Sequence, residues 1–142
     1  MRDYEECKRL VRRFYDGVNS NDREALNGLL DEDYVFHNWR DTFRGRDAAY
    51  GFLDGLQAAF PDMRIEVGEQ VADDTYVVSN LRMTGTHEGE FEGISPTNKP
   101  VDANGMVMFK FKGDKIVEQW AQWDVLGMLS QVGARTTTDP NC

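Results

Sequence analysis

The hydrophobic pattern of this chain changes its period near residue 61, and that change restricts the folds open to it. Before residue 61, apolar residues recur three or four positions apart, as they do on one face of an amphipathic helix. After it, apolar and polar residues alternate, beginning with Met63, Ile65 and Val67, as they do in a half-buried strand. Helices followed by meander strands predict an α+β domain whose helices cover one face of a curved antiparallel sheet. Such a sheet can enclose a cavity suited to a small molecule.

The first half of the chain predicts three helices and a short strand. Residues 3 to 18 carry a continuous apolar stripe at helical spacing. Asn21 followed by Glu24 resembles a capping box and predicts the start of a short second helix. Residues 34 to 36 are expected to form a strand, and a third helix follows and ends at Pro61.

The second half predicts the sheet. Strands are expected over residues 75 to 86 and 101 to 111. Because Lys112-Gly113-Asp114 marks a tight hairpin, residues 103 to 111 and 115 to 123 should pair in antiparallel fashion. The remaining segments are a loop rich in glycine and proline, a last short helix and a polar tail: Glu88 to Pro100, Asp124 to Gly133, and Ala134 to Cys142. We therefore expect one domain over residues 1–133 and a tail, expected to be mobile, over residues 134–142.

Charge and cysteine content exclude several classes of partner. The 142 residues include 25 acidic and 16 basic side chains, and the net charge of -9 repels nucleic acid and acidic lipid headgroups. We therefore expect neither nucleic acid nor a membrane as partner. Two cysteines, Cys7 and Cys142, are too few for a disulfide framework or a zinc site, so a cytoplasmic location is expected. The acidic bias suits a salt-rich cytoplasm but also occurs in ordinary acidic proteins.

Few side chains offer chemistry. The sequence has no glycine-rich phosphate loop, no nucleophile elbow and no metal-ligand spacing, so we expect no cofactor and no metal. His37 follows the first strand and could act as a base at a pocket mouth, or be a structural histidine at its rim. His87 is expected to fix the turn into the glycine-rich loop. Asp124 either caps the last helix or contributes to catalysis.

Both faces of the last strand carry tryptophan. Val117, Gln119, Ala121 and Trp123 share one face, which we assign to the cavity. Ile116, Glu118, Trp120 and Gln122 share the other face, and Met106 and Met108 of the neighbouring strand lie beside them. An outward face this apolar predicts a homodimer that packs sheet against sheet, unless residues 124–142 fold back over it.

The order of several short motifs resembles the SnoaL-like polyketide cyclase family, whose members are often called ester cyclases. The motifs that carry the resemblance, over about residues 5 to 133, are Val11-Arg12-Arg13-Phe14-Tyr15, Tyr34-Val35-Phe36-His37, Phe60-Pro61-Asp62, Gly85-Thr86-His87, Gly89, Phe91, Gly93-Ile94, Pro96-Thr97, Lys99, Gly113 to Glu118, and Asp124 to Gly133. The resemblance implies the cone-shaped fold of the nuclear transport factor two-like superfamily. It also implies an intramolecular aldol cyclisation without cofactor or metal, and a dimeric or larger assembly.

The same resemblance implies that two polar groups of the cyclases are missing. The aspartate that serves as their general base corresponds to Ala121, and a histidine of the catalytic members corresponds to Val107. The fold is also similar to that of ketosteroid isomerases, whose tyrosine and aspartate correspond to Phe14 and Asn38. A shift of one position would bring Tyr15 and His37 into those places instead.

Two functions are consistent with these residues. The first is an enzyme of cyclase, isomerase or lyase type, or a hydroxylase-like variant, acting on a hydrophobic substrate that bears a carbonyl. Its expected catalytic residues are His37, Gln119 and Asp124, with His37 as base and Gln119 orienting the substrate. Its expected substrate-binding residues are Phe14, Tyr15, Asn38, Trp39, Leu53, Val107, Ala121 and Trp123. The second function is a binder of a hydrophobic small molecule that has lost catalysis.

Overall fold

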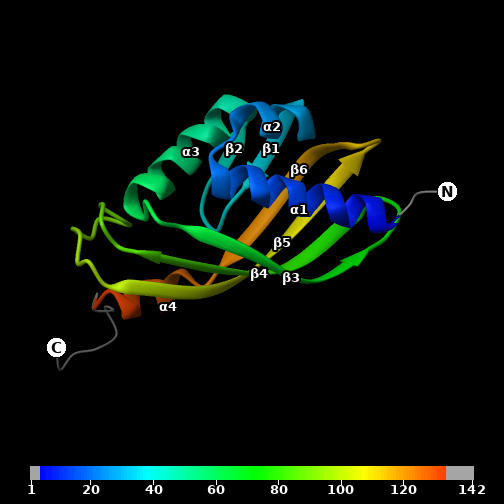
Figure 1. Cartoon of the computed structure of the whole chain (residues 1–142). Helices are drawn as coiled ribbons and strands as arrows, with labels where there is room; N and C mark the ends of the chain where they lie inside the picture. The colour runs from blue at the N-terminus through cyan, green and yellow to red at the C-terminus, as the bar shows by residue number, and fades with distance from the viewer. Residues whose placement is uncertain (1–3, 134–142) are drawn as a thin grey trace.

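The computed structural model describes residues 4–133, and within them three helices cover the concave face of one six-stranded sheet (Figure 1). The three covering helices are α1 (Tyr4–Ser20), α2 (Arg23–Leu29) and α3 (Arg46–Ala59). A fourth helix, α4 (Val125–Gln131), follows the last strand. The strands are β1 (Leu30–His37), β2 (Thr42–Arg44), β3 (Arg64–Ala72), β4 (Tyr76–Thr86), β5 (Pro100–Lys112) and β6 (Lys115–Trp123). The predicted α+β class is confirmed.

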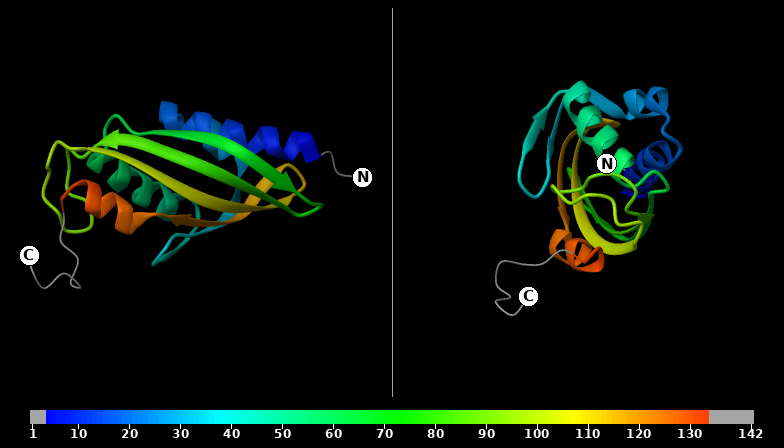
Figure 2. Two further views of the ribbon diagram at one scale, coloured as in Figure 1. Left: turned by 90° about the horizontal axis from the view of Figure 1, so that it is seen from below. Right: turned by 90° about the vertical axis from the view of Figure 1, so that its left-hand side faces the viewer.

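The strands follow the order β2-β1-β6-β5-β4-β3 across the sheet. β1 pairs in parallel with β6, whereas every other neighbouring pair is antiparallel, including the predicted hairpin of β5 and β6. The sheet curls toward α1 and α3, as the right-hand view of Figure 2 shows. This curvature leaves an enclosed volume between the sheet and the helices.

The core lies between α1 and the concave face of the sheet. Seven residues of α1 are buried, and they form the stripe that the helical spacing predicts. β5 alternates strictly between buried and exposed positions over its first half, which turns Val101, Ala103 and Val107 toward this core. No helix within residues 4–133 has the length and apolar character needed to span a membrane.

A β-bulge corrects our assignment of one outward residue. The pairing of β5 with β6 shifts between Lys110 and Phe111, because Val117 is the extra residue of the bulge. The shift turns Ile116 inward, where it is fully buried, instead of outward beside Trp120. The outward apolar face therefore lacks Ile116.

The start of α2 also differs from the prediction by one residue. Asp22, not Asn21, is the N-cap, and its side chain accepts a hydrogen bond from the Ala25 backbone N–H at 3.1 Å. Asn21 has a φ of 54° and makes the turn out of α1. The helix itself lies where the apolar pattern predicts it.

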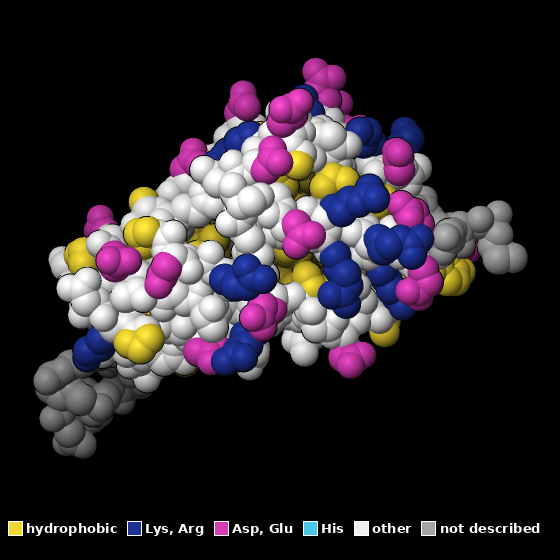
Figure 3. All heavy atoms as spheres, viewed as in Figure 1, with side chains coloured by type: hydrophobic (Ala, Val, Ile, Leu, Met, Phe, Trp, Pro, Cys, Tyr) yellow, Lys and Arg dark blue, Asp and Glu magenta, His cyan; other side chains and the backbone are white. Residues whose placement is uncertain are grey.

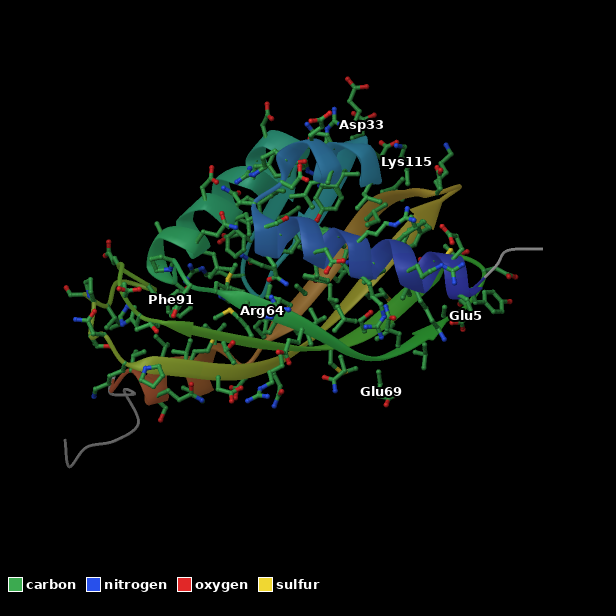
Figure 4. The ribbon with its side chains drawn as sticks, viewed as in Figure 1. Glu5, Asp33, Arg64, Glu69, Phe91 and Lys115 are labelled. Atoms are coloured by element: carbon green, nitrogen blue, oxygen red, sulfur yellow. The ribbon has the colours of Figure 1, made fainter. Side chains whose placement is uncertain are left out.

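Loop 88–99 and α4 each pack against another element of the fold. Loop 88–99 folds back onto the end of α3, where Glu88 and Gly89 donate to the Ala59 carbonyl and Phe91 packs 5.1 Å from Phe60 (Figure 4). α4 packs at the beginning of β5, where Gln131 exchanges hydrogen bonds with the backbone of Asp102. It leaves Met106 of the outward face 55% exposed, and residues 134–142 lie outside the described part.

Candidate functional site

A largely apolar cavity of about 70 Å³ lies between the helices and the concave face of the sheet. It is lined by Phe14, Tyr15, Val18, Leu26, Leu30, Tyr34, Phe36, Ala49, Tyr50, Phe52, Leu53, Leu56, Ile65, Gln119, Ala121 and Trp123. None of these lining residues is an acid, a histidine, a lysine or an arginine. On the face drawn in Figure 3, hydrophobic side chains show only as small separate areas among charged ones.

Three hydrogen-bonded side chains form the polar centre of the cavity. Gln119 is 5% exposed, and its Oε1 accepts a hydrogen bond from the Tyr34 hydroxyl. Its Nε2 donates to the Tyr15 hydroxyl at 3.5 Å. Because Tyr15 accepts from Gln119, its own proton remains available to a ligand oxygen. This chain of bonds runs in one direction, from Tyr34 through Gln119 to Tyr15.

Burial keeps both phenols protonated. Desolvation raises the pKa of Tyr15 and of Tyr34 far above the usual value of a tyrosine. Both hydroxyls therefore remain hydrogen-bond donors near neutral pH, and neither can serve as a base there. Donors of this kind stabilise negative charge that develops on a carbonyl oxygen.

Each member of this centre is positioned by a different element. Tyr15 belongs to the buried stripe of α1, where its ring meets Phe14 at 4.9 Å and Phe109 at 6.0 Å. Tyr34 projects inward from β1, and Gln119 projects inward from β6 opposite Phe36. The parallel pairing of β1 with β6 brings Tyr34 and Gln119 together.

Tyr50 of α3 forms the cavity wall next to α2. Its hydroxyl donates to Oδ1 of Asn27 at 2.6 Å, and the guanidinium carbon of Arg23 lies 4.5 Å from the centre of its ring. Arg23 also pairs with Asp54 of α3. Partial burial raises the pKa of Tyr50, while Arg46 and Arg23 act in the opposite direction.

Six of the predicted site residues meet at this cavity: Phe14, Tyr15, Leu53, Gln119, Ala121 and Trp123. Trp123 lies close over Gly105, where a side chain would collide with its indole ring. Ala121 occupies the position expected from strand alternation, on the same face as Gln119. The strand pattern of β6 thus predicted one whole wall of the cavity.

Three predicted substrate-binding residues lie elsewhere. Val107 is buried beside Ala121 in the sheet but does not reach the cavity surface. Asn38 holds the turn after β1, because its Oδ1 accepts from the backbone of Arg40 and Asp41. Trp39 packs against the outer side of Phe52 at 5.7 Å. These three residues support the structure around the cavity but do not line it.

His37 lies on the opposite face of the sheet from the cavity, which corrects the expected position at its mouth. Alternation along β1 turns Phe36 inward and His37 outward, where its ring stacks on Trp120 at 5.3 Å. Its Nδ1 meets the Thr42 hydroxyl at 2.9 Å and its Nε2 meets Glu118 at 2.6 Å. As a base, His37 would need a ligand outside this cavity.

Asp124 and His87 have structural surroundings. Asp124 is exposed and accepts from the Gly127 backbone at 2.9 Å, so it caps α4 and does not line the cavity. His87 is fully buried, and its Nδ1 meets the Thr97 hydroxyl at 3.0 Å across loop 88–99, as predicted for a residue that fixes this loop. Its Nε2 has no partner within the described residues.

The sequence pattern did not single out Tyr34 and Tyr50 as site residues. Tyr34 precedes Phe36 by two positions and so shares its inward face. Strand alternation could therefore have identified Tyr34 as a residue of the cavity. Tyr50 follows Ala49 on the apolar side of α3. Within residues 4–133, no three His, Cys, Asp or Glu side chains gather where they could hold a metal ion.

Known structures share this arrangement over nearly the whole chain. IdmH from Streptomyces antibioticus, a proposed polyketide cyclase, is 30% identical, with 90% of this chain and 99% of that one covered and a TM-score of 0.81. AclR from Streptomyces galilaeus, a proposed hydroxylase, is 25% identical, with 92% and 98% covered and a TM-score of 0.81. A protein from Catenulispora acidiphila with a ketosteroid isomerase-like fold is 15% identical, with 89% and 93% covered and a TM-score of 0.76, and shows the fold alone.

The sequence profile of one family extends over most of the chain. That family is described as SnoaL-like polyketide cyclase, and its profile matches residues 8–132. The matched range includes most of α1, all six strands and every residue that lines the cavity. Among proteins with curated descriptions, none matches the chain. The chain therefore belongs to the SnoaL-like polyketide cyclase family.

Proposed function

We propose that the chain acts on a neutral, hydrophobic small molecule bearing a carbonyl and promotes cyclase-type chemistry on it. The observation that carries this proposal is the directed chain of hydrogen bonds from Tyr34 through Gln119 to Tyr15. It leaves one phenolic proton for a ligand oxygen at the centre of an apolar cavity. Of the catalytic residues predicted from the sequence, Gln119 is the one that this proposal retains.

The proposed chemistry is polarisation of the ligand carbonyl. In an aldol ring closure, a carbon beside a carbonyl loses a proton, and the resulting enolate carbon bonds to a second carbonyl carbon. A hydrogen bond from Tyr15 would stabilise the enolate oxygen, and the buried surroundings strengthen that bond. Because the lining holds no ionisable base, the proton of that carbon would pass to water. When the new carbon–carbon bond forms, the second carbonyl oxygen becomes an alkoxide, which takes a proton back from water, so the closure neither gains nor loses protons overall.

A second candidate function is binding without turnover. It is favoured by one observation, which is that Ala121 stands in the lining where the cyclases of the family carry their general base. Both functions require affinity for flat, oxygen-bearing apolar ligands. They differ in whether a new carbon–carbon bond forms.

Product analysis by mass distinguishes the two functions. The protein is incubated with a linear aromatic poly-β-ketone, and cyclised product is sought after correction for the uncatalysed reaction. We expect cyclised product, and the Tyr15→Phe variant should form it at least tenfold more slowly, because one donor to the enolate is lost. His37→Ala serves as the control variant and should retain the activity, because His37 lies on the other face of the sheet. Unchanged poly-β-ketone bound tightly by the protein would instead establish the binder.

We also propose that the outer face of the sheet carries a second copy of the chain. One row of side chains crosses five strands there as successive partners: His37, Trp120, Met108, Val78 and Val71. Val71 is 67% exposed, which is unusual for a large apolar side chain in a row of this kind. Glu118 and Lys110 flank the row as neighbouring partners and can pair across a two-fold axis.

A further inference from the structure

In this structure the cavity is too small for the ligand class that its lining suits. Its volume of about 70 Å³ compares with roughly 300–1,000 Å³ for typical small-molecule sites. A ligand with two or three fused rings therefore requires one wall of the cavity to move. The question is which wall the structure holds least firmly.

α3 is the helix of the cavity wall that buries the smallest share of its residues. α1 buries seven residues, whereas α3 buries only Ala49 and Ala59. Apart from the buried Ala49, the side chains through which α3 lines the cavity are partly exposed: Tyr50, Phe52, Leu53 and Leu56. Elements held by few buried apolar groups open at lower free energy than the rest of a fold.

Two glycines weaken this helix without any packing reason. Gly51 and Gly55 are exposed, and a Cβ at either position would meet no atom within 4 Å. Neither has a positive φ, so the backbone does not require glycine. Each glycine in a helix interior costs about 1 kcal/mol relative to alanine. The middle of α3 is therefore less stable than it would be with alanine at these two positions, where alanine would fit.

A small set of contacts latches α3 to α2. Arg23 pairs with Asp54, which lies between the two glycines, and stacks on Tyr50. Tyr50 in turn donates to Asn27. Arg23 and Asp54 are 30% and 65% exposed, and contacts at such positions contribute little in water. The latch can therefore break and re-form readily.

We propose that α3 is the lid of the cavity, which opens by loosening of the helix around Gly51 and Gly55 and is held shut by Arg23. The lid rests on the proposed function in that the ligand must pass into this cavity. Closing would return Phe52 and Leu53 to the ligand. The lid thus sets how fast ligands are exchanged.

The first test needs no ligand and uses hydrogen exchange of the backbone amides. In the native protein, amides 52–57 should exchange faster than those in the middle of α1. The double variant Gly51→Ala/Gly55→Ala should slow their exchange about five- to thirtyfold, since one or two kcal/mol changes an opening equilibrium by that factor. Gly28→Ala is the matched control, because Gly28 is also an exposed helical glycine with open space around it. It should leave α3 unchanged.

The second test follows binding of 1,8-dihydroxyanthraquinone by stopped-flow tryptophan fluorescence, since Trp123 lines the cavity. In the double glycine variant, the association and dissociation rates should fall together by about fivefold or more, while the dissociation constant changes less. Arg23→Gln should raise both rates. A change confined to the dissociation rate would mean that contacts, and not a lid, were altered.

The two tests separate the failure of the lid from the failure of the proposed function. If amides 52–57 exchange as slowly as α1 in the native protein and the double variant leaves them unchanged, the lid is refuted. If 1,8-dihydroxyanthraquinone and linear poly-β-ketones fail to bind any variant, the proposed function fails, and the hydrogen-exchange result still decides whether α3 opens. Unchanged binding rates in the double variant would refute the lid even where binding occurs.

Discussion

At the scale of single residues, Gln119 decides the character of the cavity. A buried amide is stable only when its oxygen and nitrogen both have partners, and two tyrosines from different elements supply them. An amide carries no net charge, so its place at the centre of an apolar cavity favours a neutral ligand over a charged one. The two tyrosines are therefore structural partners of Gln119 as much as ligand contacts.

The first prediction concerns Tyr34→Phe. The phenylalanine fills the same volume but leaves Oε1 of Gln119 without its donor, so the free energy of unfolding should fall by about 1–3 kcal/mol. Urea denaturation followed by circular dichroism measures the change. Tyr76→Phe is the control, since the Tyr76 hydroxyl has no hydrogen-bond partner among residues 4–133 and its loss should cost far less. Equal losses in the two variants would contradict the importance of this bond.

The sequence predicted one side of the site better than the other. Alternation along β6 placed Gln119, Ala121 and Trp123 on one face, because that strand is regular from Glu118 onward. His37 was misplaced because the predicted strand ended at Phe36, so the alternation was not extended to His37, which is the last residue of β1. Tyr50 depends on the packing of α3 against α2, which a single sequence does not contain.

At the scale of elements, the width of the cavity depends on the contact between β5 and β6. Gly105 is the Cα partner of Trp123, and the indole lies where a Cβ would otherwise be. The missing side chain lets the indole ring of Trp123 lie close over the backbone of β5. A glycine on one strand thus makes room for a side chain of the next strand that lines the cavity.

The second prediction is that Gly105→Ala moves Trp123. The new Cβ would lie 2.5 Å from the indole ring, so the ring must shift, and overpacking of this kind costs about 1–3 kcal/mol. The shift should appear as a change in the wavelength of tryptophan emission together with a lower unfolding midpoint. In a Trp123→Phe background, the same alanine should cost much less, because the smaller ring leaves space. Additive losses would show that the two residues do not collide.

The third prediction concerns Asp62, which joins the turn before β3 to the end of β4. Its carboxylate accepts from the Thr86 hydroxyl and the Thr86 backbone, both at 2.7 Å, and these bonds lower the pKa of Asp62. A lowered folded pKa stabilises the fold above the unfolded value of about 3.9, and this contribution is lost as pH falls through the folded pKa. Asp62→Ala should therefore lower the melting temperature at pH 7 and have little effect near pH 2.

Melting curves across this pH range provide the measurement, with Asp33→Ala as the control. Asp33 is an exposed aspartate whose carboxylate accepts no hydrogen bond from the described residues. Its replacement should change the melting temperature little at either pH. An Asp62→Ala effect that is as large at pH 2 as at pH 7 would rule out the charged hydrogen bonds as its cause.

At the scale of the whole molecule, the change of hydrophobic period was sufficient to predict the fold class. Three of the four helices precede β3, and from β3 to β6 each strand pairs with the next along the chain. The parallel pairing of β1 with β6 was not predicted, because its residues are far apart in sequence and no turn specifies it. The bulge at Val117 was missed because one inserted residue leaves the apolar pattern of β6 nearly intact.

The fourth prediction tests self-association through the outer face. Trp120 is the largest side chain of the apolar row and lies between His37 and Met108, so Trp120→Glu should convert a dimer into a single chain with the fold unchanged. Light scattering at micromolar concentration gives the mass, and circular dichroism checks the fold. Arg13→Glu on the exposed side of α1 is the control and should leave the mass of the dimer. A native protein with the mass of one chain would refute the second copy.

The position of β6 in the sheet has a consequence for the synthesis of the protein. β6 fills the place between β1 and β5, and its contact with β1 joins His37 to Glu118 across 81 positions of sequence. A growing chain therefore carries its helices and first strands out of the ribosome long before the central partner of β1 exists. Until β6 emerges, β1 and β2 cannot join β5 and the sheet remains in two parts, so this domain can complete its folding only after β6 has left the ribosome.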